Sequence, residues 1–121
     1  MDNMEKTATS TMTIGREASL WWRGYALQIY LDGQKIGGLY QKTQMNFTIP
    51  AGRHVLTLRI PFPSCDAAEP IVFDARPGED LRFNVRCIAN FDTQSAPLAA
   101  FFSPQARDAW GKQLFAVQRV A

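Results

Sequence analysis

Residues 25–60 have the sequence YALQIYLDGQKIGGLYQKTQMNFTIPAGRHVLTLRI, and this stretch decides the fold. Apolar and polar residues alternate on both sides of the Asp32-Gly33 pair, and the alternation resumes after residues 50–52, Pro-Ala-Gly. Asp-Gly between alternating segments is a strong signal for a β-hairpin, because a type I′ turn needs a positive φ at both central residues. The stretch therefore predicts antiparallel β-sheet.

Similar short segments lie on either side of it, from residues 13–16 and 19–22 to residues 114–120. Short strands separated at regular intervals by turn residues predict an all-β domain, an antiparallel β-sandwich of about seven strands, rather than a fold of alternating strands and helices. Ser103 followed by Pro104 is typical of a helix start. It predicts one short helix near the C-terminus.

The composition fits one globular domain, since 46% of the 121 residues are hydrophobic and 20% are charged. Residues 1–12 are polar and rich in Thr and Ser, so we expect a flexible leader before a single domain over residues 13–121. No segment is typical of a signal peptide or a membrane span, which predicts a cytoplasmic protein with reduced cysteines. The net charge of +2 does not favour nucleic-acid binding.

Several turn segments carry a resemblance to a known family. Residues 30–33 are Tyr-Leu-Asp-Gly, residues 50–56 are Pro-Ala-Gly-Arg-His-Val-Leu, and residues 76–79 are Arg-Pro-Gly-Glu. Over about residues 29–85 their order resembles bacterial PEGA-type domains and related small β-sandwich domains. The resemblance implies an immunoglobulin-like or prealbumin-like sandwich that acts as a surface or interaction module, without shared catalytic residues.

His54 is the only histidine, and it closely follows the turn at residues 50–52. A catalytic base would need a nucleophile and a carboxylate, and no spacing in the sequence provides that set. We therefore expect a structural residue whose ring nitrogen bonds a nearby backbone group, and we assign no catalytic residue and no cofactor. Together with Cys65 and Cys87, His54 could supply three zinc ligands, but no paired Cys or His motif supports a metal site.

Cys65 and Cys87 have two further interpretations. A disulfide between them would close a loop of about twenty residues and add roughly 3 kcal/mol of stability in an oxidising compartment. We favour Cys87 as a small core residue on an alternating strand and Cys65 as a loop thiol. Five acidic residues cluster in the same region but lack the spacing of a calcium loop. They are Asp66, Glu69, Asp74, Glu79 and Asp80.

Three arginines, Arg59, Arg82 and Arg86, are predicted to point outward from their strands. If those strands are neighbours, the guanidinium groups form a basic stripe with Tyr30 nearby, and such a stripe could bind an acidic partner or RNA. The alternative is a solvated sheet face with cross-strand ion pairs, and the near-neutral net charge favours it.

Trp21 and Trp22 are adjacent in a candidate strand, so their side chains point to opposite faces. One interpretation is an exposed aromatic surface that stacks on sugars or binds a protein. The other is that the C-terminal segment folds back and covers one of them. The first predicts that Trp22→Ala weakens association and leaves the melting temperature nearly unchanged.

These features favour a non-enzymatic β-sandwich that makes protein–protein contacts, including a homodimer through a sheet edge. The alternative is a carbohydrate or small-ligand binding module that uses tryptophan and arginine, and an enzyme is a remote alternative. The residues assigned to binding are Trp21, Trp22, Tyr30, Arg59, Arg82 and Arg86.

Overall fold

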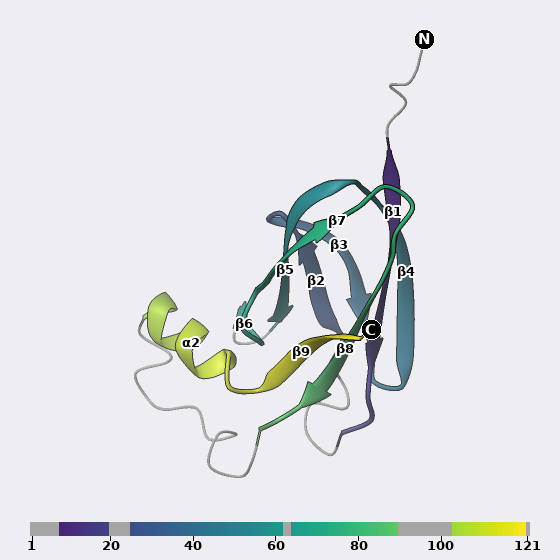
Figure 1. Cartoon of the computed structure of the whole chain (residues 1–121). Helices are drawn as coiled ribbons and strands as arrows, with labels where there is room; N and C mark the ends of the chain where they lie inside the picture. Colours follow the sequence, from purple (N-terminus) through teal and green to yellow (C-terminus); the bar gives the residue numbers. More distant parts are fainter. Residues whose placement is uncertain (1–7, 20–24, 62–63, 90–102, 121) are drawn as a thin grey trace.

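Two β-sheets make up most of this computed structural model, which describes residues 8–19, 25–61, 64–89 and 103–120 (Figure 1). One sheet has the strand order β4-β1-β8-β9, and the other has the order β3-β2-β5 with β6 and β7 both paired to β5. The elements are β1 (Thr9–Arg16), β2 (Leu27–Leu31), β3 (Gln34–Leu39), β4 (Thr43–Pro50), β5 (Gly52–Ile60), β6 (Cys65–Asp66), β7 (Ile71–Ala75), β8 (Asp80–Cys87), α2 (Pro104–Gly111) and β9 (Phe115–Val120).

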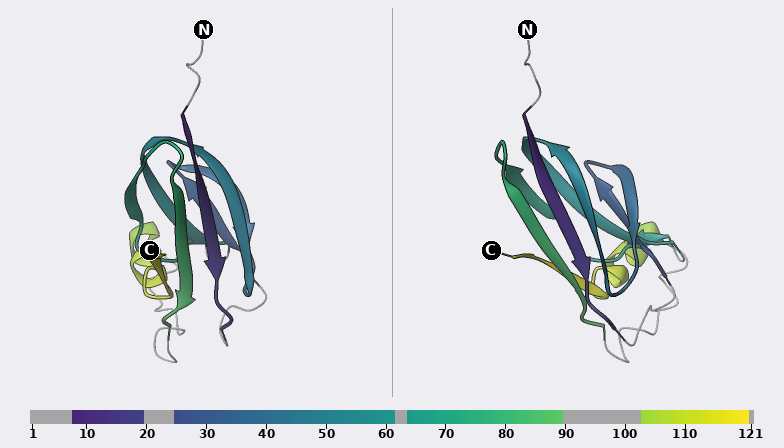
Figure 2. Two further views of the ribbon diagram at one scale, coloured as in Figure 1. Left: turned by 45° about the vertical axis from the view of Figure 1, so that its right-hand side comes forward. Right: turned by 90° about the vertical axis from the view of Figure 1, so that its right-hand side faces the viewer.

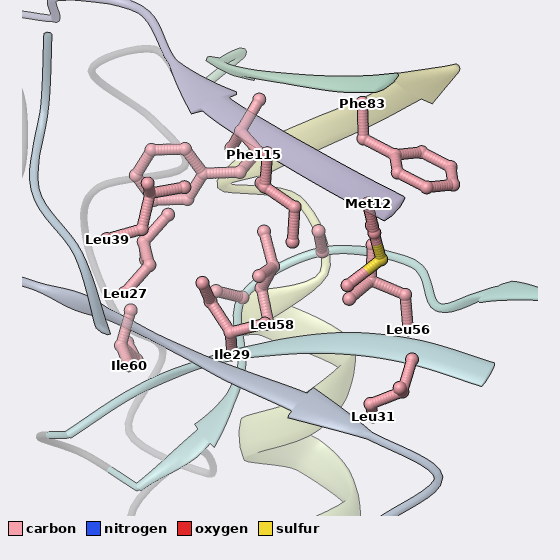
Figure 3. Packing of buried hydrophobic residues seen from close by; sticks show 14 of the residues in the cluster. Met12, Leu27, Ile29, Leu31, Leu39, Leu56, Leu58, Ile60, Phe83 and Phe115 are labelled. Carbon is pink, nitrogen blue, oxygen red and sulfur yellow. The ribbon is translucent and has the colours of Figure 1, made fainter. Parts of the chain in front are cut away.

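The core lies between the sheets, which form two layers in the views of Figure 2. Every second side chain of β1, β2, β5 and β8 is buried, as the sequence alternation predicts. Figure 3 shows these side chains meeting across the interior. The labelled members of this core are Met12, Leu27, Ile29, Leu31, Leu39, Leu56, Leu58, Ile60, Phe83 and Phe115.

The predicted turns are confirmed by their backbone angles. Asp32 and Gly33 have φ values of 53° and 84°, as a type I′ hairpin turn between β2 and β3 requires. At the turn between β7 and β8, Gly78 has a φ of 76° and the N–H of Glu79 donates to the carbonyl of Arg76 at 3.0 Å. The turn chemistry in the sequence therefore sets where these strands reverse.

The start of the chain differs from the expectation. Strand β1 begins at Thr9, so the expected leader over residues 1–12 includes half of a core strand. Met12 is fully buried, and the hydroxyl of Ser10 donates to the carbonyl of Arg76. The threonines in this segment favour a strand once its Met and Ile side chains can be buried. Of the expected strand at residues 19–22, Ser19 is outside any strand and residues 20–22 lie outside the described ranges.

The sheets are also not purely antiparallel, because β1 pairs in parallel with β8. Parallel neighbours need a long connection between them, and here the whole second sheet lies between β1 and β8 in the sequence. Alternation in a sequence shows which face a side chain takes but not which strand lies beside it. Within the described ranges there are nine strands rather than about seven, and β6 has only two residues.

Gly37 of β3 lets side chains from β4 cross the gap between the two sheets. A Cβ atom at Gly37 would lie 3.2 Å from Cζ of Phe47 and 3.7 Å from Cε of Met45. The β2–β3 pairing shifts register between Ile29 and Tyr30. A glycine inside a strand is typical of such a close approach and of such an irregularity in pairing.

Helix α2 packs on β6, at the edge opposite to β3. The predicted start is confirmed, since the backbone N–H of Ala106 donates to the hydroxyl of Ser103 and Pro104 opens the helix. Gly111 ends the helix in very close contact with the sheet, because a Cβ atom there would lie 1.8 Å from the carbonyl oxygen of Asp66. The helix thus covers the short strand β6 (Figure 1).

Candidate interaction surface

The tryptophans assigned to binding, Trp21 and Trp22, lie outside the described residues. The expected effect of Trp22→Ala on association therefore stays a prediction. The same holds for the alternative of a sugar-binding module, because stacking on these two rings was its basis.

The predicted basic stripe does not form, because its arginines lie in different sheets. Arg59 is on β5, whereas Arg82 and Arg86 are on β8 of the opposite sheet. Tyr30 is on β2, which pairs with β5, so it shares the outer face of a sheet with Arg59 alone of the three. Since the two sheets present their outer faces in opposite directions, no single partner surface joins all four residues.

Arg59 has a structural position. Its guanidinium group lies 2.7 Å from a carboxylate oxygen of Asp66 and 3.9 Å from one of Asp108. The carboxylate of Asp108 also accepts a hydrogen bond from the backbone N–H of Asp66 at 2.9 Å. These contacts join β5, β6 and α2. Arg82 is exposed and pairs with Asp80 of its own strand at 3.1 Å, so this ion pair is not the cross-strand kind that the alternative of a solvated sheet face expects.

Both cysteines are free thiols. Cys65 is a residue of β6 rather than of a loop, and its side chain is fully buried next to Gly111 of α2. Burial raises the pKa of its thiol to about 11. Cys87 is half-buried near the end of β8. The disulfide considered from the sequence is therefore not formed. Among the described residues, no three side chains of the His, Cys, Asp or Glu type are grouped as metal ligands.

His54 links the two turns that the sequence singles out. Its Nδ1 lies 2.6 Å from a carboxylate oxygen of Asp32, and its Nε2 lies 2.6 Å from the carbonyl oxygen of Pro50. A carbonyl oxygen and an ionised carboxylate only accept hydrogen bonds, so this geometry favours the protonated ring, in which both nitrogens donate. The second carboxylate oxygen of Asp32 accepts from the backbone N–H of Val55 at 2.8 Å.

This arrangement shifts two pKa values. Burial of the ring lowers the pKa of His54, but the hydrogen bonds to Asp32 and Pro50 outweigh that effect and place it above 6.5. The hydrogen bond from His54, and then the one from Val55, lower the pKa of Asp32 below 3.8. The expected bond from a ring nitrogen to the backbone is present. The role of Asp32 was missed, although its side chain belongs to the turn that the sequence emphasises.

Strand β4 forms an uncharged edge of the first sheet. Within the part of the chain that the structure describes, each of the other edge strands carries a charged residue, and these are Lys35, Asp66, Asp74 and Arg119. Residues 43–50 contain none, and no described strand pairs with the far side of β4 (Figure 2). Proteins usually protect long edges with charge, proline or a covering element, and β4 has only Pro50 at its end. The signal was visible in the sequence as eight neutral residues.

The backbone of this edge is available for pairing. The N–H of Ala51 donates to the carbonyl of Ala8 at 3.0 Å and continues the β1–β4 register by one step. Alternate residues of an antiparallel strand bond the same neighbour, so the odd-numbered residues of β4 face β1. The N–H and C=O groups that point away from β1 belong to Gln44, Asn46 and Thr48.

An apolar pocket of about 320 Å³ opens beside this edge, between β4 and the second sheet. Its apolar lining comes from β2, β3 and β4, and its polar end is formed by the His54–Asp32 pair and by Pro50. Phe47 and Ile36 are only half-buried there. The apolar lining residues are Leu31, Ile36, Phe47 and Ile49.

A second pocket of about 620 Å³ lies between β7 and β8, and charges of both signs form its rim. Arg119 lies 2.7 Å from a carboxylate oxygen of Glu79. A hydrogen bond from the backbone N–H of Arg76, together with the charge of Arg119, lowers the pKa of Glu79. Because Arg119 and Glu79 already pair with each other, this pocket offers less to a partner than the neutral β4 edge does.

In the described parts of the chain, no helix has the length and apolar character needed to cross a bilayer. The chain matches no protein-family model, and a search of curated proteins finds no match for it.

Proposed function

We propose that this chain is a non-enzymatic interaction or assembly module that receives a β-strand from a protein partner along the outer edge of β4. The fold would be a β-sandwich of the immunoglobulin-like or prealbumin-like type, in keeping with the resemblance to PEGA-type domains. Strand addition supplies affinity through main-chain hydrogen bonds, and neighbouring pockets supply specificity by accepting alternate side chains.

The observation that carries the proposal is the combination found at β4. This edge strand has eight residues and no charge, its outward backbone groups are unpaired by any described strand, and an apolar pocket opens beside it. Each of these features alone is common. Together they match what an added strand needs, which is a straight row of donors and acceptors beside apolar contact area.

The His54–Asp32 pair supports a structural role over a catalytic one, although it lines the same pocket. A histidine that acts as a base keeps one ring nitrogen directed at the substrate while the other contacts the carboxylate. In His54 that second nitrogen is bound to the carbonyl of Pro50. The pair therefore holds the end of β4 in place and leaves no ring nitrogen for proton transfer.

The test compares two substitutions at Thr48, whose N–H faces the free edge. Thr48→Pro removes that donor, and proline is tolerated where the N–H of an edge strand points to solvent. Thr48→Val removes the hydroxyl but keeps the donor and the branched shape, so it is the matched control. Capture of partners from native lysate and self-association by light scattering are measured for both variants and for the wild type.

We expect the wild type and Thr48→Val to retain association and Thr48→Pro to lose most of it. Equal association of all three proteins would overturn the proposal. If Thr48→Pro does not fold, the proposal is tested by amide hydrogen exchange of the wild type instead. The amides of Gln44, Asn46 and Thr48 must then exchange more slowly when the partner is present.

A further inference from the structure

We propose that the strand received at β4 is β4 of a second copy of this chain, paired in antiparallel fashion around a two-fold axis at Asn46. The inference rests on the proposed function and names the partner. Three features support it: the lack of charge in β4, the register in which two copies of β4 can pair, and the position of the pocket beside this strand.

The charge pattern selects β4 as the edge at which two copies can meet. A two-fold interface places the same surface of each copy against the other, so every charge on it meets a like charge nearby. Pairing through β3 or β9 would bring two copies of Lys35 or of Arg119 into one short ribbon. Since β4 has no charged residue, a β4–β4 pair avoids this repulsion, which is unfavourable between facing strands.

The pattern of β4 is also complementary to itself. In an antiparallel pair, the apolar face stays continuous only if even residues oppose even residues and odd residues oppose odd ones. The register centred on Asn46 meets this condition. It sets Asn46 against its own copy, Gln44 against Thr48, and Met45 against Phe47. Because Gln44, Asn46 and Thr48 carry the outward backbone groups, this register pairs all of them.

The apolar side of the pair coincides with the pocket. The side chains of Met45 and Phe47 both extend from β4 toward Gly37 of β3, and Phe47 lines the pocket beside the edge. In the Asn46-centred register, Met45 of the second copy lies opposite Phe47. A flexible methionine at that point covers the half-buried ring and the open side of the pocket. Association would therefore bury the apolar surface that the monomer leaves accessible.

The experiment uses opposite charges at the axis. Asn46→Lys and Asn46→Asp each place two like charges directly opposite one another in the dimer, and an equimolar mixture of the two variants places opposite charges there. Analytical ultracentrifugation over a range of concentrations measures the dissociation constant in each case. The controls are Gln118→Lys and Gln118→Asp, which make the same charge changes at an exposed polar residue of the other edge strand, β9.

We expect the wild type to dimerise and each Asn46 variant alone to dimerise at least about tenfold more weakly. The mixture of the two variants should recover most of the wild-type affinity. The Gln118 variants should dimerise as the wild type does. Failure of the mixture to recover, or equal weakening by the Gln118 variants, would overturn the inference. The substituted side chain is exposed, and its lost bond to Thr13 is also exposed, so the variants are expected to fold.

The outcomes separate this inference from the proposed function. If the purified chain stays monomeric while lysate capture still depends on the N–H of Thr48, then the second copy is excluded and strand addition stands. If neither self-association nor β4-dependent capture occurs, both fail. If a variant at Asn46 does not fold, amide hydrogen exchange of the wild type is measured instead. The inference then requires that exchange at Asn46 slows as the protein concentration rises.

Discussion

Strands β6 and β4 both lie at sheet edges, but one is covered and the other is bare. The two residues of β6 lie under helix α2, and the carboxylate of Asp108 accepts a hydrogen bond from their backbone. Arg59 adds an ion pair to Asp66 on the same edge. The eight residues of β4 have no covering element among the described residues and no charge.

The difference is that contacts with α2 and Arg59 protect the β6 edge, whereas no described element protects the β4 edge. A bare neutral edge on an otherwise protected fold is a place for association, because an unpaired strand pairs readily with another chain. The comparison predicts that substitutions at the covered edge change stability and substitutions at the bare edge change association.

The largest effect is expected at the covered edge, from Gly111→Ala. The added methyl group would lie 1.8 Å from the carbonyl oxygen of Asp66, so helix and strand must separate. We expect a loss of about 2–3 kcal/mol in the free energy of unfolding, measured by urea denaturation. The control is Gly15→Ala, where the nearest atom is 3.8 Å away. Equal losses in the two variants would show that α2 does not clamp this edge.

On β5, which is not an edge strand, His54→Gln is expected to lower the unfolding free energy by about 1–3 kcal/mol at pH 6, because the charge-assisted hydrogen bond to Asp32 is lost. The pKa of His54 is above 6.5, so its contribution is complete below pH 6.5 and is lost as the pH rises through the pKa in the folded protein. The pKa of Asp32 is below 3.8, so its contribution is complete above pH 3.8 and is lost as the pH falls.

The stability due to this pair is therefore greatest between pH 3.8 and pH 6.5. Urea denaturation at several pH values should show the wild type losing stability above pH 6.5, whereas His54→Gln should not. Asp32→Asn is the control, because asparagine also accepts the positive φ of this turn but lacks the charge. A wild-type profile that rises above pH 6.5 would contradict the charged state of the ring.

A smaller effect is expected from Arg59→Met, about 1–2 kcal/mol of unfolding free energy, since it leaves the largely buried carboxylate of Asp66 without its cation. The matched control is Arg53→Met. Arg53 pairs with Asp74, but both side chains are about 70% exposed, at 73% and 67%. That change should stay within about 0.5 kcal/mol. Chemical denaturation of both variants tests whether the arginine at the covered edge has a structural role.

The smallest effect is expected from Val72→Thr on β7. Val72 is 60% exposed and faces outward beside Val55, so it forms a small apolar patch away from β4. The change keeps a β-branched side chain, and we expect less than about 0.5 kcal/mol in stability and no change in association. Sedimentation velocity checks the second point. Loss of association in this variant would move the interaction surface from the β4 edge to the outer face of β5 and β7.

Much of the fold could be predicted from the sequence, because turn chemistry and alternation are local. Gly33 and Gly78 have positive φ values, and Ser103 caps a helix as expected. The neighbours of β1 could not be predicted in this way. The alternation that buries Met12 and Ile14 is compatible with any order of strands in the sheet. The parallel pairing with β8 therefore depends on how the complete chain folds.

The candidate site, like the fold, could be predicted from the sequence only in part. The bond from a ring nitrogen of His54 to a backbone carbonyl is present as expected, and the absence of charge in β4 can be read directly from the sequence. The bond between His54 and Asp32 could not be predicted, because it requires β2 and β5 to be neighbours. The condition for a basic stripe, that the strands of its arginines are neighbours, is not met for the same reason, since outward direction alone does not place Arg59 and Arg82 on one surface.

The parallel pairing of β1 with β8 also has a consequence for the order of events during synthesis. Strands β2, β3, β5 and β7 follow one another closely, so their sheet can assemble while later residues are still being added. The first sheet cannot, because β1 must wait for β8 to emerge from the ribosome. Until then β4 is the only neighbour in its sheet with which β1 can pair, and the side of β1 that faces β8 in the folded protein stays open. We therefore expect the nascent chain to be most prone to aggregation, and most dependent on chaperones, in the interval before Asp80–Cys87 emerges.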